Sequence, residues 1–143
     1  MSLSDTERAA LKDVVGTMIP ADAGLGLPGA DDPAILDDLV ASLGRDLPAV
    51  RDALAALAAL GFAGLDRPAR EALLNDPARA GRATMAVLGR VAVSAYYRDD
   101  RVLRSLGMEP GAPFPKGYAV EPGDFSLLDT VRTRAPFWRS DRP

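Results

Sequence analysis

The chain contains no cysteine and no histidine among its 143 residues. Without cysteine it has no disulfide, thiolate nucleophile, iron–sulfur ligand or covalent haem attachment. Without histidine it lacks the commonest general base and the commonest haem or zinc ligand. Carboxylates can still perform acid–base chemistry or bind magnesium. The two absences therefore disfavour catalysis by this chain alone, and an autonomous helical enzyme that uses carboxylates with Tyr96 or Tyr97 stays an alternative.

Long apolar runs and a strong charge of one sign are also missing. The apolar stretches are too short and too interrupted to cross a bilayer, so no direct membrane insertion is expected. The net charge is −3 and basic and acidic side chains alternate, so we expect no nucleic-acid partner. The start, MSLSDTER, shows neither a secretory nor a twin-arginine signal. This predicts a cytoplasmic protein, or a periplasmic one only if a signal was trimmed or the chain is exported with its partner.

No segment alternates like a β-strand, whereas apolar residues recur at helical spacing along most of the chain. We therefore predict an all-α fold: a single compact domain of about six or seven helices, with a long Pro/Gly-rich extended segment near the C-terminus. Residues 1–106 would form the helical core, and residues 107–143 an extended strap, a short helix and a tail. The predicted helices span residues 5–18, 33–43, 47–60, 67–74, 78–98 and 99–106, followed by a short helix capped by Asp124.

The helix predicted within residues 78–98 is the most apolar and should be central. Its inward face comprises Ala83, Val87, Leu88, Val91, Ala92, Ala95 and Tyr96. Because successive helical residues are 100° apart, Tyr97 should point outward when Tyr96 packs inside. In the helix predicted at residues 99–106, Val102, Leu103 and Leu106 are expected to face inward.

Three adjacent aspartate pairs and one glycine-rich loop have both chemical and structural interpretations. The pairs are Asp31–Asp32, Asp37–Asp38 and Asp99–Asp100. Each suits a helix N-terminus, where a carboxylate meets the positive end of the helix dipole, better than a metal site. The run GLGLPG at residues 24–29 is a weak phosphate-loop signal, because no strand is predicted before it. A plain connecting loop is the simpler interpretation.

The C-terminal third is rich in aromatic residues but has little regular structure to bury them. Aromatic, methionine and arginine side chains are enriched in protein interfaces. We therefore predict a partner-binding surface built on the helix end near Tyr97 and on the strap, residues 108–118. The predicted contact residues are Tyr97, Arg98, Met108, Phe114, Pro115, Lys116, Gly117, Tyr118 and Trp138. Two alternatives stay open: the strap folds back over its own helices, or the exposed aromatics meet across a twofold axis in a self-associating module.

The order of several short motifs resembles a known family. The segments are LKDVVGTMIPAD at residues 11–22, a middle section with Phe62, Leu65 and Arg70, and AYYRDDRVLRSLGMEPGAPFPKGY at residues 95–118. The last segment pairs two tyrosines with an acidic residue, a leucine–glycine and a proline-bearing stretch that ends in glycine–tyrosine. In this order the segments resemble the gluconate 2-dehydrogenase subunit 3 family, the small subunits of flavin-dependent sugar and alcohol dehydrogenases.

That resemblance implies a non-catalytic partner protein. Members of the family bind a large FAD-dependent oxidoreductase of the glucose-methanol-choline type and assist its maturation or stability, sometimes beside a cytochrome c subunit. The implied assembly is a hetero-oligomer in which FAD belongs to the large subunit and this chain holds no cofactor, no metal and no catalytic residue. Family members often carry a twin-arginine signal, and this sequence departs from the pattern there.

Overall fold

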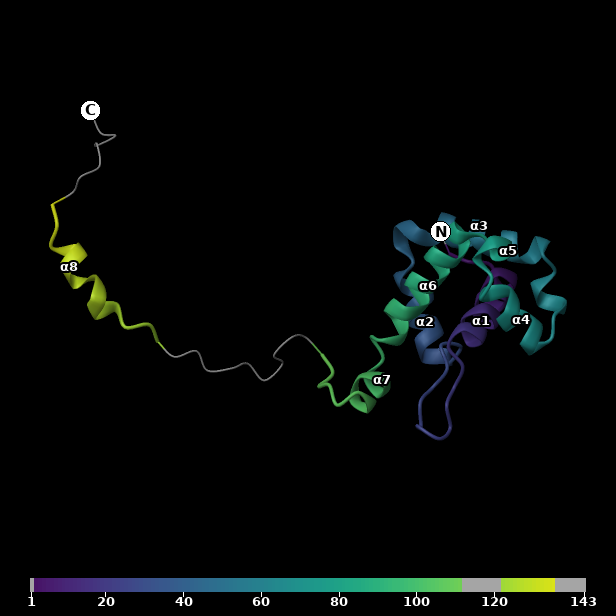
Figure 1. Cartoon of the computed structure of the whole chain (residues 1–143), viewed down its shortest axis with the longest axis horizontal. Coiled ribbons are helices and arrows are strands. Elements are labelled where there is room, and N and C mark those ends of the chain that lie inside the picture. Colours follow the sequence, from purple (N-terminus) through teal and green to yellow (C-terminus); the bar gives the residue numbers. More distant parts are fainter. Residues whose placement is uncertain (1, 112–121, 136–143) are drawn as a thin grey trace, which may run out of the picture. The chain divides into compact units, whose positions relative to one another are not determined.

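The computed structural model describes residues 2–111 and 122–135, and residues 2–111 form one compact helical body. In the described ranges the regular structure is helical, apart from one isolated bridge between Asp22 and Leu27. The all-α prediction is therefore confirmed. The helices of the body, drawn in Figure 1, are α1 (Asp5–Met18), α2 (Pro33–Ser42), α3 (Leu47–Ala59), α4 (Arg67–Leu74), α5 (Pro77–Ala80), α6 (Arg82–Tyr96) and α7 (Asp100–Ser105). Short 3-10 turns at Gly44–Asp46 and Phe62–Gly64 flank α3.

The helix starts follow from local side-chain chemistry. Ser4 and Glu7 form the expected capping box before α1. Asp32, Asp66 and Asp99 each accept a hydrogen bond from a backbone N–H in the first turn of α2, α4 and α7. Proline also lies in the first turn of α2 and α4, where its missing N–H has no helical partner to lose.

Helix α6 is the centre of the body, as predicted. It packs chiefly against α3 and α2, with further contacts to α5 and α1. Leu88 and Ala92 are completely buried, and Val91, Ala95 and Tyr96 are nearly so. Its other predicted inward residues are less buried: Val87 is partly covered and Ala83 is exposed. The apolar face therefore begins about one turn later than the sequence pattern indicated.

The continuous helix predicted over residues 78–98 is wrong in one respect, because it is divided into α5 and α6. Gly81 lies between them with φ of +89°, a backbone conformation that residues with a Cβ rarely adopt. The turn at Gly81 lets Ala80 pack into the core before α6 begins. A glycine at this position was the signal for the break.

At the end of α7, one residue expected to face inward is exposed. Leu106 is 56% exposed because α7 ends at Ser105, leaving a helix so short that only Val102 reaches the core. Gly107, with φ of +73°, then turns the chain, and the N–H of Met108 donates to the carbonyl oxygen of Leu103 at 3.0 Å.

The glycine-rich segment between α1 and α2 is an ordered loop that projects from the body (Figure 1). Asp22 and Leu27 exchange two backbone hydrogen bonds, and the N–H of Ala30 donates to the carbonyl oxygen of Ile19 at the base of the loop. Leu25 at the tip is 71% exposed. The loop follows a helix, so it lacks the strand that a dinucleotide-binding fingerprint requires.

Residues 122–135 belong to a separate small unit of the chain. Asp124 accepts hydrogen bonds from the N–H and hydroxyl of Ser126 and thereby starts a 3-10 turn, Phe125–Leu128, as the sequence indicated. The turn continues into α8 (Asp129–Arg132). Every residue of this unit is exposed, including its apolar side chains.

Candidate partner-binding surface

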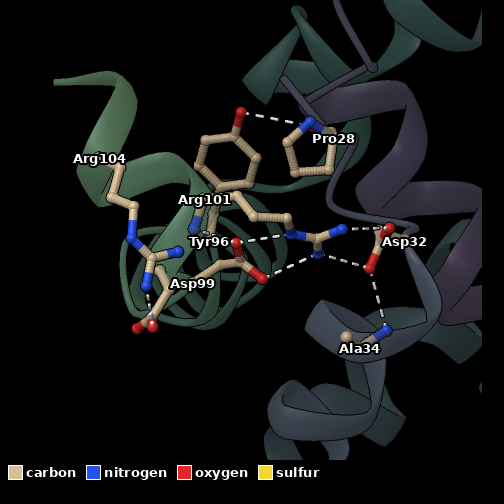
Figure 2. Close-up of polar contacts among 8 residues, drawn as sticks. Pro28, Asp32, Ala34, Tyr96, Asp99, Arg101 and Arg104 are labelled. Atoms are coloured by element: carbon tan, nitrogen blue, oxygen red, sulfur yellow. Dashed lines mark hydrogen bonds and ion pairs between the residues drawn. The ribbon is translucent and has the colours of Figure 1, made fainter. Parts of the chain in front are cut away.

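Arg101 of α7 contacts Asp32 at the start of α2. Its guanidinium contacts both oxygens of Asp32, with Nη2–Oδ1 2.8 Å and Nη1–Oδ2 3.1 Å. It also contacts both oxygens of Asp99, with Nε–Oδ1 2.9 Å and Nη2–Oδ2 2.8 Å. Figure 2 shows Arg101 lying between the two carboxylates, which also cap α2 and α7. We call Arg101, Asp32 and Asp99 the Arg101 clasp.

The clasp keeps its three groups charged. Hydrogen bonds from Arg101 are the main reason that the pKa of Asp32 and the pKa of Asp99 lie below their usual value, and backbone N–H donors of the capped helices lower them further. Burial opposes this effect for both carboxyls. The two carboxylates in turn raise the pKa of Arg101, Asp99 most strongly. The clasp is thus a fixed ionic contact at neutral pH.

Tyr96 ties the projecting loop to the end of α6. Its hydroxyl donates to the carbonyl oxygen of Pro28 at 3.2 Å, and the residue is only 7% exposed (Figure 2). Burial raises the pKa of Tyr96, and the neighbouring Tyr97, Asp99 and Asp22 raise it further. A hydroxyl that is buried, neutral and engaged with a backbone carbonyl serves packing, as predicted, rather than a proton relay.

Two residues of the predicted partner surface are exposed on the body. Tyr97 is 49% exposed and meets the ring of Tyr96 edge to face, with the ring centroids 5.5 Å apart. Met108, just beyond α7, is 56% exposed. The other predicted contact residues in the strap and tail lie outside the described residues: Phe114, Pro115, Lys116, Gly117, Tyr118 and Trp138.

Arg98, the remaining predicted contact residue, has partners within its own chain. Its guanidinium donates to Asp38 Oδ2 at 2.6 and 2.9 Å and to Ser42 Oγ at 2.7 Å. Asp38 lies inside α2, one residue from Asp37, which pairs with Arg8 of α1. The expectation that Asp37 and Asp38 lie at a helix N-terminus is therefore wrong, because both lie inside α2, where they pair with Arg8 and Arg98.

A groove of about 430 Å³ lies beside the Arg98–Asp38 pair. It is lined by Ala34, Ile35, Asp38, Ala95, Arg98, Asp99 and Asp100. Each of its carboxylates accepts a hydrogen bond from an arginine: Asp38 from Arg98, Asp99 from Arg101 and Asp100 from Arg104. No three acidic groups in residues 2–111 and 122–135 are arranged to hold a metal ion. The groove thus offers contact area, with its carboxylates already engaged by arginines.

Among the described residues, exposed large apolar side chains are most frequent in the later part of the sequence. The exposed ones among the described residues are Leu25, Leu60, Val93, Tyr97, Leu106, Met108, Phe125, Leu127, Leu128 and Val131. All but Leu25 and Leu60 follow residue 92. Sequence reasoning missed Val93, although its spacing of one helical turn from Tyr97 places both on one face. It also missed Arg101, because its long-range partner Asp32 leaves no local sequence signal.

No family model, curated protein or solved structure matches the chain. In the described ranges, no helix has the length and apolar character that a bilayer span needs.

Proposed function

We propose that this chain is a non-catalytic small subunit that binds and stabilises a larger FAD-dependent oxidoreductase of the glucose-methanol-choline type, one that oxidises a sugar, glycoside or other alcohol. The observation that carries the proposal is the exposure of large apolar side chains at the end of the compact body, at Val93, Tyr97, Leu106 and Met108. Tyr97, Met108 and Phe125 are of the types that interfaces enrich. Exposed apolar side chains of these types on a folded body favour a surface that another molecule covers.

The polar groups of the body support a binding role over catalysis. Flavin chemistry is performed by the cofactor in the partner, and the protein around a cofactor supplies binding and orientation. The carboxylates along the groove are engaged by arginines, and the hydroxyl of Tyr96 is engaged by Pro28. The chain has no histidine or cysteine to add a base or a thiolate. Its contribution would be surface that orders and stabilises the flavoprotein.

In the part of the family motif that the structure describes, three residues have a structural role. Tyr96 holds the loop through Pro28, and Asp99 caps α7 and holds Arg101. Gly107 turns the chain out of α7. These residues together fix the course of the chain from the end of α6 through α7 to Gly107. A motif whose members fix the start of a following segment suits a protein that presents that segment to a partner.

The proposal is tested by capture from the native host. We expect the tagged full-length chain to co-purify with a flavoprotein, identified by mass spectrometry and by its flavin fluorescence. Replacing both Phe114 and Tyr118 by alanine should reduce the captured flavoprotein at least about tenfold, because aromatic anchors dominate interface energies. The far-ultraviolet circular dichroism of the variant should stay unchanged. Lys12→Glu, on the exposed side of α1, is the control and should capture as the wild type does.

Two outcomes would reject the proposal. One is turnover of an alcohol by the isolated chain with added FAD and a dye acceptor. The other is the absence of any flavoprotein from the wild-type capture; a dimer seen by light scattering in that case would favour self-association.

A further inference from the structure

Helix α6 has an outer stripe that its own chain leaves uncovered. Arg82, Ala86, Arg90, Val93 and Tyr97 are all exposed. At 100° per residue, these positions fall within an arc of about 80°, and at 1.5 Å per residue they extend over about 22 Å. We call these residues the α6 stripe. Its C-terminal half presents the half-exposed side chains of Val93 and Tyr97. In the middle of the stripe, the small side chain of Ala86 projects less than its neighbours do.

The charged side chains that α6 itself contributes to this surface are all positive. The chain has no aspartate or glutamate between Asp76 and Asp99, although it has 20 acidic residues in all. Arg90 is paired with Asp46 at 2.7 Å, and Arg98 with Asp38 at 2.6 Å. Arg82 makes no ion pair within the described ranges, and neither does Arg79 on α5. The N-terminal end of the α6 stripe is therefore positive, and the positive end of the helix dipole adds to it.

We infer that the α6 stripe docks an amphipathic helix of the partner. This helix would place apolar side chains against Val93 and Tyr97, and carboxylates near Arg82 and Arg79. The inference rests on the proposed function and specifies the chemistry by which the large subunit is recognised. A helix fits because the stripe has the length of about four helical turns, and a low centre such as Ala86 allows two helix axes to approach closely.

A second copy of this chain is a poorer occupant of the α6 stripe. If it docked through its own α6 stripe, it would bring the same arginines, and the carboxylate there, Asp46, is already paired with Arg90, so no free counter-charge would reach Arg82. An acidic helix supplies one. The charge complementarity also predicts that association is faster at low salt than at high salt, because exposed charges are screened as ionic strength rises.

The test measures affinity between purified wild-type or variant full-length chain and the flavoprotein identified by the capture experiment. We expect Tyr97→Ala combined with Val93→Asp to weaken binding by at least about thirtyfold, the loss typical of a hot spot. Arg82→Glu should weaken it by about tenfold and reduce its salt dependence. A glutamate in the first turn interacts favourably with the positive end of the helix dipole, so Arg82→Glu should not destabilise α6.

A matched control changes the same kinds of side chain elsewhere: Lys12→Glu on α1 and Leu25→Asp at the loop tip. We expect this variant to bind as the wild type does, and circular dichroism checks that every variant is folded. Unchanged binding of the α6 variants would overturn the inference and leave the proposed function standing. Loss of binding only in the control would indicate that the partner docks on another face, and this result would also overturn the inference about the α6 stripe. If the wild type binds no flavoprotein, the proposed function fails and this inference fails with it.

Discussion

Arg101 is the side chain whose removal the structure predicts to be most informative. Asp99 is only 13% exposed and Asp32 23% exposed, so removing the guanidinium leaves two carboxylates without their main donor. We expect Arg101→Met to lower the free energy of unfolding by about 1–2 kcal/mol at neutral pH, measured by urea denaturation. Arg104→Met is the control: Arg104 forms an exposed pair with Asp100, and its loss should change stability by less than about 0.5 kcal/mol.

The pH dependence of the same variant follows from the lowered pKa of Asp32 and of Asp99. A carboxyl whose pKa is depressed by folding stabilises the protein fully above its unfolded pKa, about 3.9, and loses that contribution as pH falls through the folded value. The stability difference between wild type and Arg101→Met should therefore be largest near pH 7 and shrink as the pH falls below about 4. A difference that stays constant down to pH 2 would contradict this account.

At the scale of a structural element, the loop between α1 and α2 depends on a glycine with ordinary backbone angles. A Cβ placed on Gly29 would lie 2.3 Å from Asp31 Oδ1 and 2.9 Å from the backbone nitrogen of Ala21. We expect Gly29→Ala to cost about 1–3 kcal/mol in stability, because backbone must move to admit the methyl group. Gly64→Ala is the control, since a Cβ there meets nothing within 4 Å. Equal melting temperatures of the two variants would contradict the prediction.

The helices themselves were largely predictable, because their ends are set by local chemistry. Ser4, Asp32 and Asp66 cap helices where the sequence indicated, and Pro20 follows the end of α1. Inward faces were harder to predict in short helices: in α7 only Val102 is buried, so the apolar pattern overstated what the helix could cover.

The candidate surface was predictable only where a local pattern sufficed. The opposite orientations of Tyr96 and Tyr97 follow from helical geometry and are confirmed. The partners of Arg98 and Arg101 were not predictable, because Asp38 and Asp32 lie 60 and 69 residues away in the sequence. The contacts assigned to Phe114, Tyr118 and Trp138 stay predictions, because those residues lie outside the described ranges.

At the scale of the whole molecule, the buried apolar core that residues 2–111 and 122–135 form runs from Leu11 to Val102 in the sequence. We therefore expect a chain truncated after Gly111 to fold, with cooperative urea unfolding and a free energy of unfolding within about 1 kcal/mol of the full-length value. Because the truncation removes Phe114 and Tyr118, capture of the flavoprotein should fall with it. A truncated chain that is unfolded, or that captures the flavoprotein undiminished, would contradict this division between folding and binding.

The position of the Arg101 clasp has a consequence for the order in which the protein matures. Asp32 is synthesised long before Arg101. During synthesis Asp32 can therefore cap α2, but its contact with Arg101 forms only later. Helix α7 is joined to the body by that contact and by Val102. We therefore expect it to be the last helix of the body to pack. In the finished protein its amides should exchange with solvent hydrogen sooner than those of α6, through an opening that leaves the rest intact.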